Sequence, residues 1–312
     1  MTARPSLDDL FERRLNYPDV DAKERFDLLV GLDDHKSRLT KILSLLVNPH
    51  SLEAWAKKHY HGIPDILAAV LRRPPLVVLA GDVGSGKSAL AETVGDAVAR
   101  QEGIDVTLFP LSLSTRGQGR VGEMTQLLSA AFDYTIEHAT KLKGSSGRAR
   151  GAVILLIDEA DALAQSREFA QMHHEDRAGV NAFIRGIDRI GSGRMPAAVI
   201  MCTNRLGALD PAVKRRAADI LAFQRPTDQQ RHAVLDQPLK QLGFTAANIT
   251  AIVNATGHTK GRSYGFTFSD LTQRFLPSII LDAYPDGKVV PVRALEIAQT
   301  IIPTAPFQDT AS

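Results

Sequence analysis

Apolar residues recur along the chain as short continuous runs, separated by segments with helical spacing. The runs lie at 75–81, 104–111, 152–160, 197–204 and 218–223. Each run is rich in β-branched and aliphatic residues, as expected of strands that are buried on both faces of a parallel sheet. The intervening segments place apolar residues on one face, as Leu90, Val94 and Val98 do in "ALAETVGDAVARQ". The alternation predicts an α/β domain built on a five-stranded parallel sheet.

The pattern changes after Pro226, where helical spacing continues without apolar runs. Four helices are predicted, at 227–243, 245–257, 267–284 and 290–302, although 289–292 is also compatible with a short strand. We therefore expect an N-terminal extension over 1–26, a large α/β domain over 27–226, a small helical domain over 227–302 and a disordered tail over 303–312. Within the extension, residues 7–15 have the pattern of an amphipathic helix.

Composition narrows the classes of function. The 312 residues include 37 basic and 35 acidic ones, and this near-neutral balance does not indicate a dedicated nucleic-acid binder. The single cysteine, Cys202, excludes an intrachain disulfide. The N-terminus lacks the apolar core of a signal peptide, and no apolar run approaches the length of a membrane span. We expect a cytoplasmic protein.

The segment "GDVGSGKS" (81–88, the phosphate loop) lies between a predicted strand and a predicted helix and matches G-x-x-x-x-G-K-[ST]. Its glycines allow backbone N–H groups to converge on phosphates, and the helix that follows directs its N-terminus at them. Lys87 is expected to reach the β- and γ-phosphates, and the Ser88 hydroxyl to ligate Mg²⁺. The residues predicted to contact the nucleotide are Asp82, Val83, Gly84, Ser85, Gly86, Lys87, Ser88 and Ala89. Such a loop serves kinases, switches and motors alike.

Two adjacent carboxylates, Asp158 and Glu159, follow the apolar run that begins at residue 152. Asp158 can hold Mg²⁺, and Glu159 can activate a water molecule as a general base. Because kinases and GTPase switches usually lack the adjacent glutamate, the pair favours hydrolysis of ATP. A purely structural interpretation, in which Glu159 stabilises a helix N-terminus, is the alternative.

The stretch from 197 to 226 resembles the second region of homology of AAA+ ATPases. It runs from the strand "VIMCTN" through "LDPA" and two arginines to a further strand and a proline. The resemblance implies that Asn204 positions the lytic water and that Arg215 or Arg216 reaches the γ-phosphate of a neighbouring subunit. Spacing does not decide between the two arginines. A finger supplied in this way makes catalysis depend on a ring.

Other segments extend the resemblance to most of the chain. "LLVGLDDHK" is similar to the segment that lines the adenine pocket, which implies backbone contacts from Val30 and Gly31. "GFTFSDL" (265–271) resembles the start of a helix in the lid domain, so the fold is expected to be an AAA+ large domain followed by a helical lid. Ser269 stands where some AAA+ families have a sensor arginine, although Arg262 and Arg274 are close in sequence.

Two further resemblances concern the substrate. "RVGE" matches the frame of the axial pore loop of AAA+ unfoldases, with Arg120 in place of an aromatic residue before Val121 and Gly122. "DRAGVNAFIRGIDRI" and "KRRAADILAFQRP" are similar to the pachytene-checkpoint branch. This branch implies a hexameric ring that uses ATP and Mg²⁺ to remodel HORMA-domain proteins. Its bacterial members are associated with antiphage cyclic-oligonucleotide signalling, in which they switch off a HORMA-activated nucleotidyltransferase.

Two other functions remain open. Many AAA+ proteins are DNA motors or loaders, but the near-neutral charge and the lack of a helix-turn-helix or zinc module argue against nucleic acid as the partner. A nucleotide-gated scaffold would not need Lys87, Glu159 and Asn204 together. The sequence therefore favours an ATPase that acts on a protein.

Overall fold

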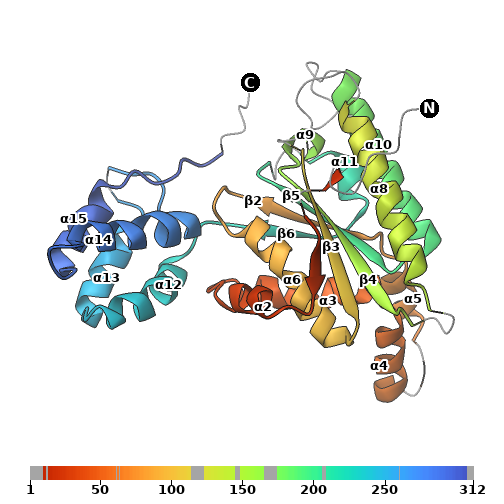
Figure 1. Cartoon of the computed structure of the whole chain (residues 1–312), viewed down its shortest axis with the longest axis horizontal. Coiled ribbons are helices and arrows are strands. Elements are labelled where there is room, and N and C mark those ends of the chain that lie inside the picture. The colour runs from red at the N-terminus through yellow and green to blue at the C-terminus, as the bar shows by residue number, and fades with distance from the viewer. Residues whose placement is uncertain are drawn as a thin grey trace. The chain divides into compact units, whose positions relative to one another are not determined.

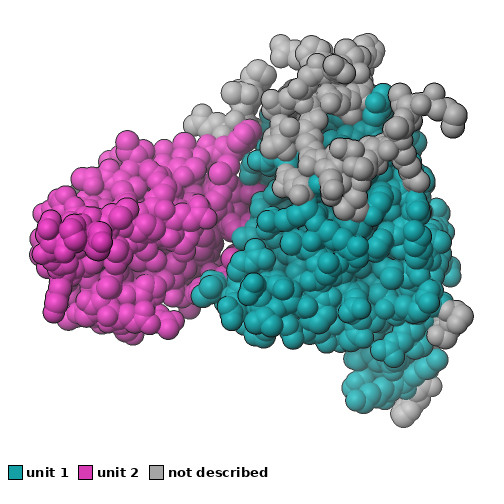
Figure 2. Space-filling view, viewed as in Figure 1, with its two compact units in different colours: residues 1–28, 34–80, 88–222 teal, residues 29–33, 81–87, 223–312 magenta. Residues whose placement is uncertain are grey.

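The computed structural model describes residues 10–11, 13–60, 62, 64–113, 123–144, 148–164, 174–205, 209–259 and 261–307. The chain divides into two compact units, coloured separately in Figure 2. The first unit comprises residues 1–28, 34–80 and 88–222, and the second comprises 29–33, 81–87 and 223–312. The second unit thus includes nearly all of the phosphate loop together with the C-terminal helices.

The first unit is an α/β domain (Figure 1). Its elements are β1 (Leu15–Tyr17), α2 (Val20–Asp27), α3 (Asp33–Val47), α4 (His50–Tyr60), α5 (Ile66–Leu71), β2 (Leu76–Gly81), α6 (Lys87–Glu102), β3 (Asp105–Ser112), α8 (Glu123–Lys141), β4 (Gly151–Asp158), α9 (Asp161–Ala164), α10 (His174–Gly193), β5 (Ala197–Thr203), α11 (Pro211–Lys214) and β6 (Ala217–Phe223). All five strands predicted from the apolar runs are present.

The strands form one sheet in the order β1-β3-β4-β5-β2-β6. The pairs β3–β4, β4–β5 and β2–β5 are parallel, which agrees with the predicted fold class. The sheet has a sixth strand that the apolar runs do not predict, because β1 pairs antiparallel with β3 and places Leu15 opposite Leu108. The helix predicted for 7–15 is therefore wrong at its end, while residues 7–9 and 12 lie outside the described residues.

Helices α8 and α10 pack against each other and against the sheet, and Figure 1 shows them side by side along one face. Phe132 on α8 and Phe183 on α10 lie edge to face, with ring centroids 6.0 Å apart. Gly186 permits this approach, since a Cβ atom there would lie 2.3 Å from the Phe132 ring. The central strands are buried on both faces, as their continuous apolar sequences predicted.

The second unit has a helical core of its own. Its elements are α12 (Asp228–Gln241), α13 (Ala246–Ala255), the π-helix η1 (Asp270–Phe275), α14 (Leu276–Ala283) and α15 (Pro291–Thr300). Phe266, Leu271, Phe275 and Ile279 are buried at its centre. The third predicted helix is thus π-helical in its first part. Pro277 has no N–H to bond the carbonyl of Gln273, which favours a departure from α-helical bonding here.

The prediction of a disordered tail is wrong for residues 303–307. The fully buried carboxylate of Asp270 accepts hydrogen bonds from the Thr304 backbone N–H at 3.0 Å and from the Thr304 hydroxyl at 2.8 Å. Asp270 also accepts a bond from the Thr267 N–H at 3.0 Å and one from Arg274 at 2.8 Å. These bonds attach the tail to the second unit; residues 308–312 lie outside the described residues.

Candidate active site

The carboxyl end of β4 carries the predicted carboxylates of the first unit, next to the end of β3. Ser112, the last residue of β3, is in register with Asp158, the last residue of β4. Glu159 follows with a φ of 53°, a left-handed conformation that is uncommon for a residue with a side chain and costs on the order of 1–3 kcal/mol. The Ser112 hydroxyl donates a 2.8 Å hydrogen bond to Oε2 of Glu159. The exposed Glu159 carboxylate is thus held at the strand edge.

A second polar group lies at the end of β5. One oxygen of Asp161 accepts hydrogen bonds from the Thr203 hydroxyl at 2.8 Å and from the Asn204 backbone N–H at 2.7 Å. Its other oxygen accepts one from Nδ2 of Asn204 at 3.2 Å. Because an ionised carboxylate only accepts hydrogen bonds, the amide nitrogen of Asn204 must face Asp161 and its Oδ1 must face away.

The phosphate loop adopts the backbone that its glycines make possible. Gly84 has a φ of 69° and Gly86 a φ of 95°, conformations that residues with side chains rarely adopt. The buried Lys87 amino group donates hydrogen bonds to the carbonyl oxygens of Gly81 at 3.0 Å and Asp82 at 2.7 Å. The Ser85 hydroxyl donates to the same Asp82 carbonyl at 2.7 Å. The loop is a compact turn, and α6 begins directly at Lys87.

Other parts of the second unit pack closely on this loop. The Ser269 N–H donates a 3.1 Å hydrogen bond to the carbonyl oxygen of Gly84, so the lid residue at the sensor position contacts the loop through its backbone. A Cβ atom on Gly84 would lie 2.7 Å from the Thr267 hydroxyl oxygen, which leaves no room for a side chain. Neither neighbouring arginine is directed to this point: Arg262 bonds the carbonyls of Ala255 and Gly257, and Arg274 bonds Asp270.

The segment predicted to line an adenine pocket also belongs to the second unit. Gly31 has a φ of 80°, and its carbonyl oxygen accepts a 2.7 Å hydrogen bond from the Gln230 side chain on α12. Val30 is partly exposed. A Cβ atom on Gly86 would lie 2.9 Å from a methyl carbon of the Leu32 side chain. The adenine segment and the phosphate loop are therefore packed together.

The residues present fit a nucleotide triphosphate and Mg²⁺. The positive-φ glycines give the loop a backbone in which successive N–H groups can face an anion, and Lys87 adds a positive charge. A side chain at Gly84 or Gly86 would collide with Thr267 or Leu32 and so disturb this backbone. The hydroxyl of Ser88, which is exposed, and the carboxylate of Asp158 are the hard oxygen ligands that Mg²⁺ prefers.

The two candidate finger arginines differ in their surroundings. Arg216 forms two bonds to the Asp188 carboxylate of its own chain, at 2.8 Å from Nε and 3.0 Å from Nη2. Arg215 is the residue directly after the last residue of α11 and is exposed. The predicted pore-loop residues Arg120, Val121 and Gly122 lie outside the described residues. Ala89 is exposed in the first turn of α6, and Val83 is partly exposed in the loop.

Two residues with contacts to the site were not predicted from sequence. Ser112 is the last residue of a predicted strand, and Asp161 follows "DEA" by one position. The position of Ser112 was a usable signal, because the ends of neighbouring parallel strands meet at one edge of the sheet. Asp161 carried no signal in isolation, since its partners lie 42 and 43 residues further along the chain.

Comparison with known proteins agrees with this geometry. Residues 77–225 match the model of the ATPase family associated with various cellular activities (AAA). CD-NTase-associated protein 6 of Escherichia coli (strain MS 115-1) is 67% identical over 312 residues, which cover 99% of each chain. The Trip13 chain in the solved E. coli MS115-1 HORMA:CdnC:Trip13 complex has a TM-score of 0.90 and 64% identity, covering 98% of this chain and 100% of that one. The structure of Rhizobiales Trip13 has a TM-score of 0.75 and 57% identity, covering 95% and 100%.

The matches extend over the whole chain and not only over the nucleotide motifs, so both units correspond to those relatives. They confirm the resemblance on which the predicted ATPase rested. Within the described residues, no helix is both long enough and apolar enough to span a bilayer. The chain is an AAA ATPase, and it belongs to the family of CD-NTase-associated protein 6.

Proposed function

We propose that this ATPase remodels a HORMA-domain protein, releases it from a CdnC-type nucleotidyltransferase and thereby switches off antiphage signalling. The observation that carries the proposal is the likeness, over nearly the full length of both chains, to a Trip13 whose structure was solved together with HORMA and CdnC. A relative of 67% identity that is named for its association with a CD-NTase supports the same assignment. The active form in this proposal is a hexameric ring.

In this proposal the nucleotide is held by the phosphate loop and the adenine segment. Backbone N–H groups of residues 82–89 bind the phosphates, and Lys87 exchanges its bonds to loop carbonyls for bonds to the β- and γ-phosphates. Val30 and Gly31 contact the base through their backbone. Ser88 and Asp158 would hold Mg²⁺, which, when bound, neutralises charge on the phosphate oxygens.

Hydrolysis depends on the residues at the strand ends. Glu159 accepts the proton of the attacking water, after its carboxylate leaves the hydroxyl of Ser112. Asn204 orients the water, and Asp161 fixes the direction of the Asn204 amide. The left-handed backbone at Glu159 supports a catalytic role, since strained conformations cluster at functional sites.

We assign the arginine finger to Arg215. The guanidinium of Arg216 is already bound to Asp188 through two nitrogen atoms, whereas Arg215 is exposed at the end of α11. An exposed arginine is available to a neighbouring subunit, where it would stabilise charge that develops on the γ-phosphate. In the same ring, Arg120, Val121 and Gly122 are proposed to grip the client.

Glu159→Gln tests the proposal most directly, because it removes the general base but keeps the size and polarity of the side chain. We expect the variant to bind ATP with unchanged affinity, to hydrolyse it at least a hundredfold more slowly and to retain the client. The assay mixes the ATPase with a HORMA protein bound to its nucleotidyltransferase. It follows ATP hydrolysis and separation of the complex by size-exclusion chromatography.

The wild-type protein should separate the complex only when ATP is hydrolysed. The proposed client would be contradicted if single-stranded DNA stimulated the ATPase activity and the HORMA protein did not. A dilute monomer that hydrolyses ATP at the full rate would contradict the finger supplied by a neighbouring subunit.

A further inference from the structure

The phosphate loop contains an acidic residue whose charge has the same sign as the phosphates. The side chain of Asp82, the second residue of the loop, is 17% exposed. One of its oxygens accepts a 2.9 Å hydrogen bond from the Val83 N–H, which shapes the turn. A neutral acceptor such as asparagine would make the same bond, so the negative charge is not needed for the turn. Near a bound triphosphate, an uncompensated carboxylate would oppose binding.

Arg225 lies against this carboxylate. Its Nε donates to Oδ2 of Asp82 at 2.5 Å, and its own side chain is only 14% exposed. The remaining guanidinium nitrogens bond two other segments of the second unit: Nη1 donates to the Gly265 carbonyl at 2.6 Å and Nη2 to the Thr304 carbonyl at 2.7 Å. The centroid of the Tyr264 ring lies 4.9 Å from the guanidinium carbon. Every nitrogen of Arg225 is thus used, each on a different segment.

The tail reaches the same carboxylate. The Phe307 N–H lies 3.4 Å from Oδ1 of Asp82, at the long end of the range for a hydrogen bond. Thr304, three residues earlier, is bonded through its carbonyl to Arg225 and through its N–H and hydroxyl to Asp270. The Asp82 carboxylate therefore faces three donors: the Val83 N–H in the loop, the Arg225 guanidinium before α12 and the Phe307 N–H in the tail.

We propose that Arg225 is a positioning residue of the ATPase site: it cancels the charge of Asp82 and holds the phosphate loop in the form that accepts ATP. The inference rests on the proposed ATP site and adds a residue from outside its motifs. Lysine would keep the charge, but only arginine presents a planar set of donors to Asp82, Gly265 and Thr304 at once. The pair is partly shielded from solvent, so salt screens it less than it screens an ion pair on the surface.

The test is a double-mutant cycle between Arg225→Met and Asp82→Asn, with Kd for a fluorescent ATP analogue and KM and kcat for ATP as the readouts. Arg225→Met leaves the carboxylate uncompensated, so we expect Kd and KM to rise about tenfold or more while kcat changes less than threefold. Asp82→Asn in the Arg225→Met background should restore Kd to within about threefold of wild type. Asp82→Asn alone leaves an unbalanced guanidinium and should lower Kd a few-fold.

A role limited to structure gives a different pattern. If Arg225 served only to bond Gly265 and Thr304, Asp82→Asn would not rescue Arg225→Met, and the inference would be wrong. Asp82→Asn alone provides a second test if Arg225→Met fails to fold, since weaker ATP binding in that variant would also overturn the inference. A wild-type protein that binds no nucleotide would contradict the proposed function itself, whereas equal binding by wild type and Arg225→Met would contradict only this inference.

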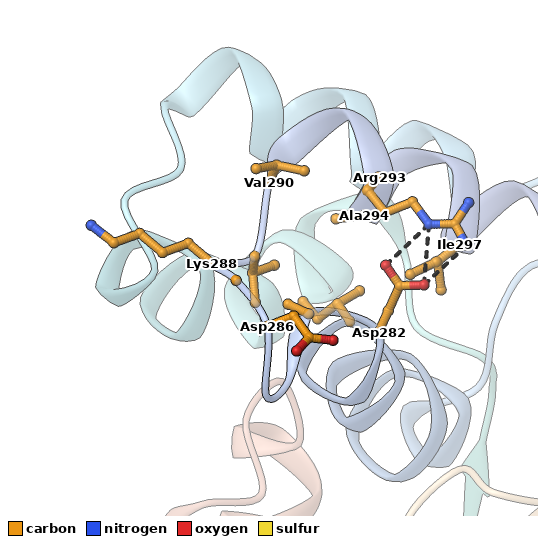
Figure 3. Close-up of a pocket in the computed structure, with 11 residues that line it drawn as sticks. Asp282, Asp286, Lys288, Val290, Arg293, Ala294 and Ile297 are labelled. Carbon is orange, nitrogen blue, oxygen red and sulfur yellow. Dashed lines mark hydrogen bonds and ion pairs between the residues drawn. The ribbon is translucent and has the colours of Figure 1, made fainter.

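Arg293→Met is the matched control. Arg293 belongs to the same unit and bonds both oxygens of Asp282, with Nε 3.1 and 3.0 Å from them and Nη2 2.9 Å from Oδ1. Figure 3 shows this pair beside a cavity of about 270 Å³ that is lined by α14, α15 and the segment between them. None of the described residues that line the cavity belongs to the phosphate loop. Loss of this guanidinium should leave Kd, KM and kcat unchanged.

Discussion

Asp161→Asn changes one atom at the end of β5 and removes the restraint on Asn204. In the wild-type protein the carboxylate accepts three hydrogen bonds, from Thr203 and from two nitrogen atoms of Asn204. Asparagine can keep the two bonds to its oxygen, but its own NH₂ group then faces the NH₂ group of Asn204. Asn204 must lose the bond or turn its amide over, and either change moves the group proposed to orient the lytic water.

The size of the effect follows from that one bond. A hydrogen bond to a charged group contributes about 1.5–3 kcal/mol, and the group here is partly buried. Each 1.36 kcal/mol corresponds to a factor of ten in rate. We therefore expect kcat for ATP to fall about ten- to hundredfold. The phosphate loop keeps its own bonds, so Kd for ATP should change less than threefold.

Steady-state ATP hydrolysis and binding of a fluorescent ATP analogue separate these two effects. Asp133→Asn is the matched control, because Asp133 on α8 is bonded at 2.6 Å to Arg189 and is exposed. It should leave both values unchanged. A normal kcat in Asp161→Asn, in a protein that is folded and assembled, would refute the view that Asp161 fixes the amide of Asn204. A rise in Kd with constant kcat would place Asp161 in nucleotide binding instead.

Two other predictions concern Asp270 and the arginine finger. Burial raises the pKa of Asp270, but hydrogen bonds from Thr267, Thr304 and Arg274 outweigh it, so the pKa is lowered on folding. The ionised Asp270 carboxylate therefore stabilises the second unit above the unfolded-state pKa of about 4, and this stabilisation is lost as pH falls through the lower folded pKa. Asp270→Asn should flatten this acid dependence and lower the free energy of unfolding of the second unit by about 2 kcal/mol. Urea unfolding and hydrogen exchange of α12–α15 measure this change. Arg215→Ala should lower ATPase activity at least a hundredfold without loss of ATP binding, whereas equal losses in Arg215→Ala and Arg216→Ala would contradict the assignment.

Much of the fold could be predicted because the features that determine it are local. The five long strands are continuous apolar runs, and the burial of β2, β3, β4 and β5 on both faces is visible in sequence. The same expectation is wrong for β6, which is only partly buried although its sequence is equally apolar. Strand β1 has only three residues and its partner is β3, so the stretch around Leu15 has the local pattern of a helix and not of a strand. The order at 303–307 depends on Asp270 and Arg225, which a window of neighbouring residues does not contain.

The site residues also differ in how far the sequence predicts them. Lys87, Asp158 and Glu159 belong to short motifs whose spacing specifies their chemistry. The partners that hold them do not: Ser112 is 47 residues from Glu159, and Arg225 is 143 residues from Asp82. Sequence separates residues that the sheet and the helical unit bring together. The distinction between Arg215 and Arg216 also needed a distant residue, because Asp188 lies 28 positions before Arg216.

Strand β1 has a consequence for solubility. A strand at the border of a sheet presents unpaired N–H and C=O groups that can recruit strands from other chains and so begin aggregation. β1 forms this edge of the sheet along part of β3. The ring of Tyr17 packs against Gly95, where a side chain would collide with it. A truncation or tag that detaches residues 15–17 would uncover the backbone of β3. The expected product is a protein that self-associates, even though every residue of the proposed ATPase site is still present.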